Sequence, residues 1–164
     1  MEIQRSAFGE EHADIAASMS NLASLYASLE RIFDAQVLYR DCITMKRKLY
    51  GMHHPALAAT LNNYATFLFT KLKKYDEAKE LYEETLRIRV FNYGNEHTLV
   101  SEALSNIALL HMTQEQYNEA RQYYEKCLSV KQAVYGYDHD STKQTKEQLL
   151  YVLVKLGLHT TGSI

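Results

Sequence analysis

The sequence predicts an all-α fold, a solenoid built from antiparallel helix pairs. An aromatic-Gly-x-x-His signature recurs along the chain, and the apolar residues between its copies follow helical spacing. The 164 residues also include only one proline and six glycines. So few turn-forming residues do not suit a β-sandwich or barrel, which needs many tight turns. The length fits one domain.

The repeated signature divides the chain into copies of nearly equal length. Its glycines lie 42, 43 and 42 residues apart, and a histidine stands three residues after each glycine. A regular period of this size is typical of stacked helical repeats. The four copies are Phe8-Gly9 with His12, Tyr50-Gly51 with His54, Tyr93-Gly94 with His97, and Tyr135-Gly136 with His139.

Each of the first three copies contains two amphipathic helices, here called helix A and helix B, and the fourth contains a helix A. In the first copy, Met19, Leu22, Ala23 and Tyr26 mark helix A at i, i+3, i+4 and i+7. Helix B carries an alanine, a tyrosine four residues later and a small residue three further on. These residues are Ala35, Tyr39 and Cys42, then Ala78, Tyr82 and Thr85, then Ala120, Tyr124 and Cys127.

Local residues indicate where the helices begin and end. Glycine after each helix B can adopt the left-handed conformation that ends a helix, and Pro55 suits the first turn of the second helix A. Asp140 and Ser141 are candidate caps of the last helix A. The second copy is one residue longer than its neighbours, and the spacing of its alanines places the extra residue near Thr70–Lys73.

The pattern resembles the tetratricopeptide repeat, and most closely the 42-residue variety of kinesin light chains and nephrocystin-3-like proteins. Residues 50–55, Tyr-Gly-Met-His-His-Pro, match the segment that joins two repeats of that variety. Residues 58–65, Ala-Ala-Thr-Leu-Asn-Asn-Tyr-Ala, match the start of its helix A. The resemblance covers residues 8 to about 157 and implies a right-handed superhelix, here of about seven helices.

We therefore expect a single tetratricopeptide domain over residues 1–164, as a fragment of a longer array. Residues 1–9 align with the end of a helix B, and a tail follows the last helix. The predicted divisions are 1–9, repeat 1 at 10–51, repeat 2 at 52–94, repeat 3 at 95–136, helix A of a fourth repeat or a capping helix at 137–157, and the tail at 158–164.

Composition excludes several classes of function. Eighteen basic and twenty acidic residues leave a net charge of -2, which gives no electrostatic reason to bind nucleic acid or an anionic membrane. No apolar run approaches the roughly 20 residues of a membrane span, and the N-terminus does not read as a signal peptide. Two cysteines do not form a disulfide framework. We expect a cytoplasmic protein.

No sequence motif supports catalysis, a cofactor or a metal. Phosphate-binding loops, His-Glu-x-x-His and nucleophile-elbow motifs are absent. The four repeated histidines occur one per repeat, and equivalent residues of stacked helices are too far apart to reach one zinc ion. We expect these histidines to form hydrogen bonds in their turns. Cys42 and Cys127 are interpreted as small packing residues. The prediction is a non-enzymatic protein without cofactor or metal.

The resemblance implies that helix A lines the concave face, where a partner would lie. Asparagine stands two residues before the helix A alanine in three repeats, and an amide side chain can pair with the N–H and C=O groups of an extended peptide. The alternative is that these asparagines bond to neighbouring repeats. The candidate peptide-binding residues are Asn21, Asn62, Asn63, Asn106, Ser24, Thr66, Phe69 and Leu109.

Anion recognition on this face would require cationic side chains. The carboxylate clamp of the chaperone-binding subfamily needs basic helix A residues, and the corresponding positions here hold none. Basic residues recur late in helix B, at Lys46, Arg89 and Lys131. They would either interact with the helix C-terminal dipole or form a cationic edge for acidic ligands.

The function predicted from these observations is binding of an extended peptide or partner segment in the helix A groove, as a scaffold or adaptor. The alternative is a structural repeat segment that self-associates through the open ends of the solenoid.

Overall fold

The computed structural model describes residues 2–158, with side chains from residue 12 onward. Within this range the chain forms seven α-helices and a short π-helix, η1, and contains no strand. The predicted all-α fold is confirmed. The elements are α1 (Glu2–Ser28), α2 (Ile32–Tyr50), α3 (Pro55–Phe67), η1 (Leu68–Leu72), α4 (Tyr75–Tyr93), α5 (Thr98–Thr113), α6 (Tyr117–Tyr135) and α7 (Asp140–Lys155).

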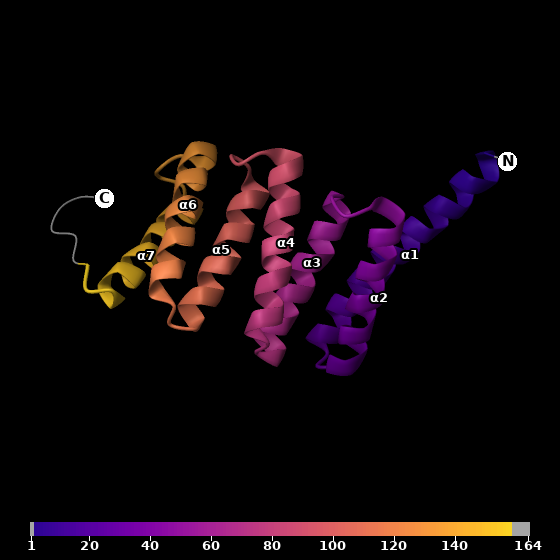
Figure 1. The fold of residues 1–164 in the computed structure, drawn as a ribbon, viewed down its shortest axis with the longest axis horizontal. Helices are drawn as coiled ribbons and strands as arrows, with labels where there is room; N and C mark the ends of the chain where they lie inside the picture. Colours follow the sequence, from indigo (N-terminus) through magenta and orange to yellow (C-terminus); the bar gives the residue numbers. More distant parts are fainter. Residues whose placement is uncertain (1, 159–164) are drawn as a thin grey trace. The chain divides into compact units, whose positions relative to one another are not determined.

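The chain divides into two compact units, Met1–Ile88 and Arg89–Ile164, with the division inside α4. In the first unit α1 packs beside α2, and α2 beside α3 (Figure 1). In the second unit α5, α6 and α7 pack in sequence order. Each predicted helix A is followed by an antiparallel helix B wherever both lie in the described chain.

The core of each unit forms where small residues bring helix A and helix B together. Ala23 and Ala35 in the first unit, and Ala108 and Ala120 in the second, are completely buried. The tyrosine of helix B fills the adjoining space and also reaches the next helix A. In the first unit the Tyr39 ring stacks on Tyr64, with centroids 5.2 Å apart.

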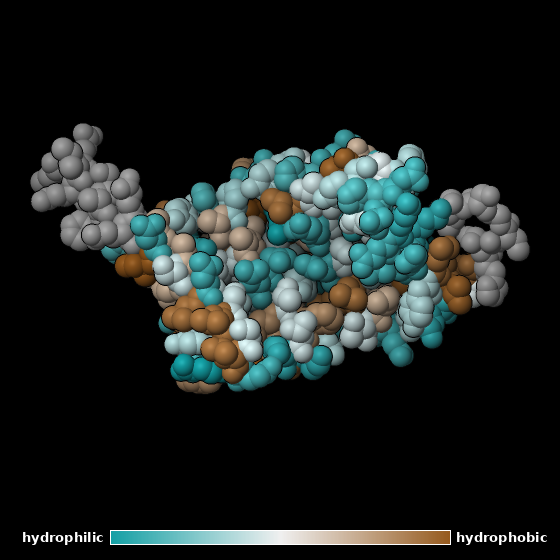
Figure 2. Space-filling view, turned by 180° about the vertical axis from the view of Figure 1, so that it is seen from behind, coloured by the Kyte–Doolittle hydropathy of each residue, from teal (hydrophilic) through white to brown (hydrophobic). Residues whose placement is uncertain are grey.

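Apolar side chains also remain exposed at the surface of the Met1–Ile88 unit. They gather near the end of α1 and the start of α2, at the lower left of Figure 2. Leu25, Leu29 and Phe33 are among the exposed residues there.

Three of the repeated histidines cap the helices that follow them. The Nδ1 atoms of His54, His97 and His139 each accept a hydrogen bond of 3.1 Å from a backbone N–H two residues later. The predicted hydrogen bond of these histidines in their turns is therefore confirmed. Asp140 and Ser141 are not the cap of α7, because His139 already occupies the N-cap position.

The extra residue of the second repeat lies inside a helix. Residues Leu68–Leu72 form a π-helix that continues α3, so the insertion falls where the spacing of the alanines placed it. A π-turn accommodates one additional residue without ending the helix. The turn after it keeps the geometry of its neighbours, because Lys73 has the same left-handed conformation as Glu30 and Glu115 (φ 55°, 58° and 59°).

The first helix differs from the prediction at its N-terminal end. The signature predicts a helix end at Gly9, but α1 continues from Glu2 to Ser28. The later copies place Asn95 or Asp138 between glycine and histidine, or Pro55 after the histidine, and these residues favour turns or helix starts. The first copy has two glutamates there, which are good helix formers. One internal glycine costs a helix only about 1 kcal/mol.

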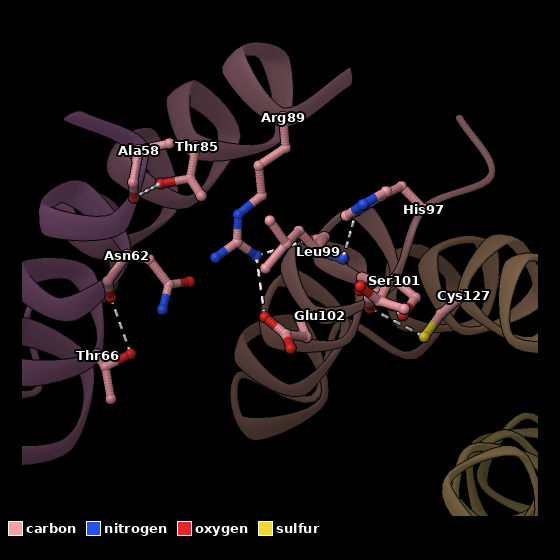
Figure 3. Close-up of polar contacts among 11 residues, drawn as sticks. Ala58, Asn62, Thr66, Thr85, Arg89, His97, Leu99, Ser101, Glu102 and Cys127 are labelled. Carbon is pink, nitrogen blue, oxygen red and sulfur yellow. Dashed lines mark hydrogen bonds and ion pairs between the residues drawn. The ribbon is translucent and has the colours of Figure 1, made fainter. Parts of the chain in front are cut away.

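A side-chain donor links helix B to helix A within each pair. The thiol of Cys42 donates to the Ala16 carbonyl at 3.1 Å, and that of Cys127 to the Ser101 carbonyl at 3.2 Å (Figure 3). Thr85 occupies the same repeat position: its hydroxyl donates to the Leu81 carbonyl of its own helix at 2.8 Å and lies 3.4 Å from the Ala58 carbonyl. The side chain at this position is therefore small and carries a hydrogen-bond donor in all three pairs. Burial raises the pKa of both thiols.

The basic residues late in helix B do not form an exposed cationic edge. Lys46 is buried and donates to the Ala56 carbonyl at 3.2 Å and to Thr60 Oγ1 at 2.8 Å. Lys131 makes the same contacts to Ser141 and Thr145. Each cation thus binds the first two turns of the next helix A, at a backbone carbonyl of the first turn and at a threonine hydroxyl one turn later.

Arg89 takes the same place in the second unit with a different partner set. Its Nη1 donates to the Leu99 carbonyl at 2.5 Å and lies 3.4 Å from Glu102 Oε2 (Figure 3). Ala103 stands where Thr60 and Thr145 supply a hydroxyl, so the carboxylate of Glu102 replaces that acceptor. Burial lowers the pKa of Arg89, and Glu102 opposes this effect.

Candidate functional site

The predicted site begins where α1 and α3 meet in the Met1–Ile88 unit. The hydroxyls of Ser20 and Thr60 lie 3.3 Å apart and join the two helices. One to two turns further along, both helices present polar residues at the surface. Ser24 is half-buried, and Asn63 and Thr66 are exposed.

A hollow of about 300 Å³ lies between these helices. Three of the predicted residues, Ser24, Asn63 and Thr66, line it together. The remaining lining residues come from the same helices, from α2 and from η1. They are Ala27, Ser28, Tyr39, Phe67, Thr70 and Lys71.

The hydroxyls of this hollow use their own protons within the protein. Ser24 Oγ donates to the Ser20 carbonyl at 3.1 Å and Thr66 Oγ1 to the Asn62 carbonyl at 2.9 Å. Ser28 and Thr70 likewise donate to carbonyls of their own helical segment. A hydroxyl has one proton and two lone pairs, so these four groups retain acceptor capacity.

Two of the hydroxyls also form hydrogen bonds with buried tyrosines. Tyr39 OH lies 3.0 Å from Ser24 Oγ, and Tyr82 OH lies 2.9 Å from Thr66 Oγ1. Because the serine and threonine protons point to backbone carbonyls, the tyrosines are the donors in these pairs. Burial raises the pKa of both tyrosines, which keeps them protonated for this role.

Donors to a ligand are fewer in the hollow. The side-chain amide of Asn63 has no hydrogen-bond partner within residues 12–158 and is exposed. The ammonium of Lys71 forms an ion pair with Glu30, which offsets its charge. The hollow therefore presents more acceptors than donors, over an apolar part formed by Ala27 and Phe67.

The other predicted residues do not line this hollow. Asn21 is exposed on α1, and Asn62 is half-buried on α3. Phe69 packs on Tyr75, with ring centroids 5.9 Å apart. Asn106 and Leu109 lie half-buried on α5, in the Arg89–Ile164 unit.

Ser28 and Thr70, which the sequence analysis did not predict as site residues, share a spacing pattern with predicted ones. Ser24 and Ser28, like Thr66 and Thr70, stand four residues apart on one face of a helical segment. This spacing pairs hydroxyls across successive turns. Lys71 was not found because the inserted residue of η1 shifts the end of the segment relative to the other repeats.

The described chain shows neither a cluster of metal-binding side chains nor a membrane-spanning helix. No three His, Cys, Asp or Glu side chains in the range that the structure describes gather as metal ligands would. None of the helices found there combines the length and apolar character that crossing a membrane requires.

Family models for the tetratricopeptide repeat match residues 14–89, 56–111 and 100–141, well over half of the chain. The chain belongs to the tetratricopeptide repeat family. The matched segments include every residue of the hollow. The comparison with curated proteins gives no match.

Several solved structures share the fold. BtubC (BKLC) from P. vanneervenii superposes with a TM-score of 0.80 at 22% identity, over 87% of this chain and 57% of that one. The nearly identical TPR-like repeats of a Podosopora anserina kinesin light chain-like protein give 0.75 at 20% identity, over 87% and 67%. A variant of the latter gives 0.77 at 20%, over 90% and 69%.

These comparisons confirm the resemblance on which the fold was predicted. At 20–22% identity the structural likeness concerns the fold. Two of the three structures are kinesin light chain-like repeats. The chain spans little more than half the length of BtubC.

Proposed function

We propose that this tetratricopeptide chain is a non-enzymatic scaffold or adaptor that binds an extended segment of a partner protein on its helix A face. Tetratricopeptide repeats generally mediate protein–protein interaction, and the family match places this chain among them. The observation that carries the proposal is the hollow in which Ser24, Asn63 and Thr66 come together.

The polar groups of the hollow suit a peptide backbone. An extended peptide presents N–H and C=O groups in alternation, and the acceptor oxygens of Ser24 and Thr66 can take its N–H groups. The Asn63 amide can both donate and accept, so it pairs with either backbone group. The half-buried Ala27 offers contact for one small apolar side chain of the ligand.

The charges of the hollow argue against an acidic side chain of the ligand as the main source of its affinity. Lys71 is its one lining cation within the described range, and Glu30 already pairs with it. Lys46, Arg89 and Lys131 are occupied by backbone carbonyls and side-chain oxygens and are buried. We therefore propose a ligand held chiefly through its backbone N–H groups.

A peptide-display selection against the chain tests this proposal, with each enriched peptide then titrated against variants. Asn63→Ala should weaken binding about 3- to 10-fold, the loss of one neutral hydrogen bond. Asn21→Ala is the matched control, because Asn21 is an exposed asparagine of the same register outside the hollow. Asn106→Ala tests the corresponding position of α5 separately.

Two outcomes of the selection would contradict parts of the proposal. Equal affinity of Asn63→Ala and the parent chain would remove Asn63 from the site. An enriched motif that depends on neither Asn63 nor Asn106 would show that these two amides are not ligand-binding groups.

A further inference from the structure

Acceptor oxygens line the hollow from two sides. Ser24 and Ser28 belong to α1, and Thr66 and Thr70 belong to α3 and η1. Each of the four hydroxyls donates its only proton to a backbone carbonyl of its own helical segment, at 2.7–3.1 Å. While these bonds are made, each oxygen can only accept a further hydrogen bond. The hollow is therefore suited to a ligand group that carries several donors.

A cation of the chain already lies at one end of the hollow. Lys71 lines it, and its ammonium forms an ion pair with Glu30, in the turn between α1 and α2. Within the described chain only one oxygen of the Glu30 carboxylate is engaged. The side chains of Lys71 and Glu30 are 36% and 67% exposed, so water screens the pair and it adds little to stability. The carboxylate can therefore exchange its partner at small cost.

Lys71 is also the residue that this repeat has in addition to the first. Counted from the helix A alanine, Thr70 corresponds to Ser28. Counted back from the left-handed residue that follows each segment, Leu72 corresponds to Leu29. Lys71 remains without a counterpart, inside η1. The hydroxyls of the hollow thus follow the repeat pattern, whereas its cation does not.

A guanidinium group complements such a site more fully than other side-chain groups. It offers five N–H donors in a fixed planar fork and keeps its charge, whereas an ammonium offers three donors on one atom and a neutral amide two. Two of its donors can bind one carboxylate, and the others can reach separate oxygens. The volume of about 300 Å³ is at the lower end of the range for ligand sites, so it suits a single long side chain.

We propose that the hollow binds an arginine side chain of the partner segment, and that this arginine replaces Lys71 at the carboxylate of Glu30. Lys71 is then an internal competitor, because its ammonium holds the carboxylate in the free chain and turns to solvent when the ligand binds. The Asn63 amide stays available to the peptide backbone. The inference rests on the proposed function for the partner segment and adds the chemistry of one ligand side chain.

Peptides that differ in one side chain test this chemistry. The probes are acetyl-Ala-Ala-X-Ala-Ala-amide, where X is arginine, citrulline, lysine, leucine or glutamate, titrated into the full chain and followed by NMR chemical shifts. Citrulline has nearly the shape of arginine but no charge. The arginine peptide should bind at least threefold more tightly than each of the others. It should shift the amide signals of Ser24, Asn63 and Thr66.

Lys71→Met removes the proposed competitor and keeps a long side chain. It should strengthen binding of the arginine peptide about 3- to 5-fold, the size expected for an exposed ion pair. Lys74→Met is the matched control, because Lys74 pairs with Glu77 at 2.7 Å, is similarly exposed and lies outside the hollow. Both variants change the net charge equally, so only a direct role of Lys71 separates them. Lys71→Gln should act in the same direction as Lys71→Met.

Glu30→Gln in the Lys71→Met background isolates the contact between the carboxylate and the ligand. The arginine peptide should bind about 3- to 5-fold more weakly than it binds to Lys71→Met alone. The citrulline peptide should change little, because it carries no charge for the carboxylate to attract.

Three results would overturn the inference. The arginine and citrulline peptides could bind equally, Lys71→Met could strengthen binding no more than Lys74→Met, or Glu30→Gln could leave the arginine peptide unaffected. Displayed peptides that depend on Asn63 but bind Lys71→Met no better than the parent chain would remove the arginine site and leave the proposed function intact. An arginine peptide that behaves as expected, while no displayed peptide depends on Asn63, would retain the arginine site and contradict the proposed backbone contact.

Discussion

Histidine caps show how single residues set the repeat boundaries. His97 accepts the Leu99 N–H at Nδ1 and stacks on Tyr93, with ring centroids 4.5 Å apart. Tyr50 with His54 and Tyr135 with His139 repeat the arrangement. The aromatic residue of the signature therefore packs on the histidine that follows it, across the turn that glycine permits.

His97→Ala should lower the free energy of unfolding by about 1–2 kcal/mol, because it removes a cap and an aromatic contact. His97→Asn should recover part of the loss, since asparagine is a good N-cap. Chemical denaturation followed by circular dichroism measures both. Glu96→Ala, an exposed neighbour, is the control, and a loss as large as that of His97→Ala would contradict the capping role.

The role of the repeated histidines could be predicted from the sequence, but the burial and contacts of the repeated basic residues could not. A basic residue in the last turns of a helix fits the helix dipole, an acidic ligand or a buried acceptor equally well. Only the burial of Lys46 and Lys131 and their contacts with the next helix decide among these. Such contacts depend on how deeply a side chain reaches between elements, which its spacing along the chain does not encode.

At the scale of the helices, paired alanines determine how closely helix A and helix B approach. Ala108 is completely buried in a cluster with Ala120 and Tyr124. Ala108→Leu should cost about 1–3 kcal/mol by overpacking this contact. Ala59→Leu, at an exposed position of α3, is the matched control and should change stability little. Equal thermal stability of Ala108→Leu and the parent chain would contradict this packing.

The elements of the candidate site were predicted more fully than its chemistry. Register placed Ser24, Asn63 and Thr66 on adjacent helix A segments, and the structure brings them together. It could not show that Ser28 and Thr70 join them, or that the hydroxyl protons point inward to backbone carbonyls. The repeated asparagines predict a site lined mainly by amides, whereas hydroxyl oxygens supply most of the polar lining in the first unit.

At the scale of the whole molecule, buried thiol and phenol groups make the free energy of unfolding decrease at alkaline pH. Burial raises the pKa of Cys42 and Cys127 above 9.0, of Tyr39 and Tyr82 above 10.0, and of Tyr124 to about 12. The unfolded chain therefore releases these protons at lower pH than the folded chain. Stability is full below the unfolded values and falls as pH rises through them.

Thermal unfolding between pH 8 and pH 11 should show this loss beginning near the ordinary thiol pKa of 9.0. The double variant Cys42→Ser and Cys127→Ser keeps a small donor at each position, as Thr85 already does. It should lose less stability between pH 8 and pH 9, where the thiols of the unfolded chain begin to titrate ahead of its tyrosines. An identical decline in both proteins would remove the cysteines as the cause.

The π-helix of the second repeat shows how a repeat can gain one residue during evolution without losing its packing. An extra codon in the middle of a helix would ordinarily rotate every later side chain by about 100° and take its apolar face out of the core. Here the additional residue is absorbed within Leu68–Leu72, and Ala78 and Tyr82 still pack as their counterparts do. Repeats of unequal length can therefore be inherited side by side, because a local change of helical pitch keeps their contacts aligned.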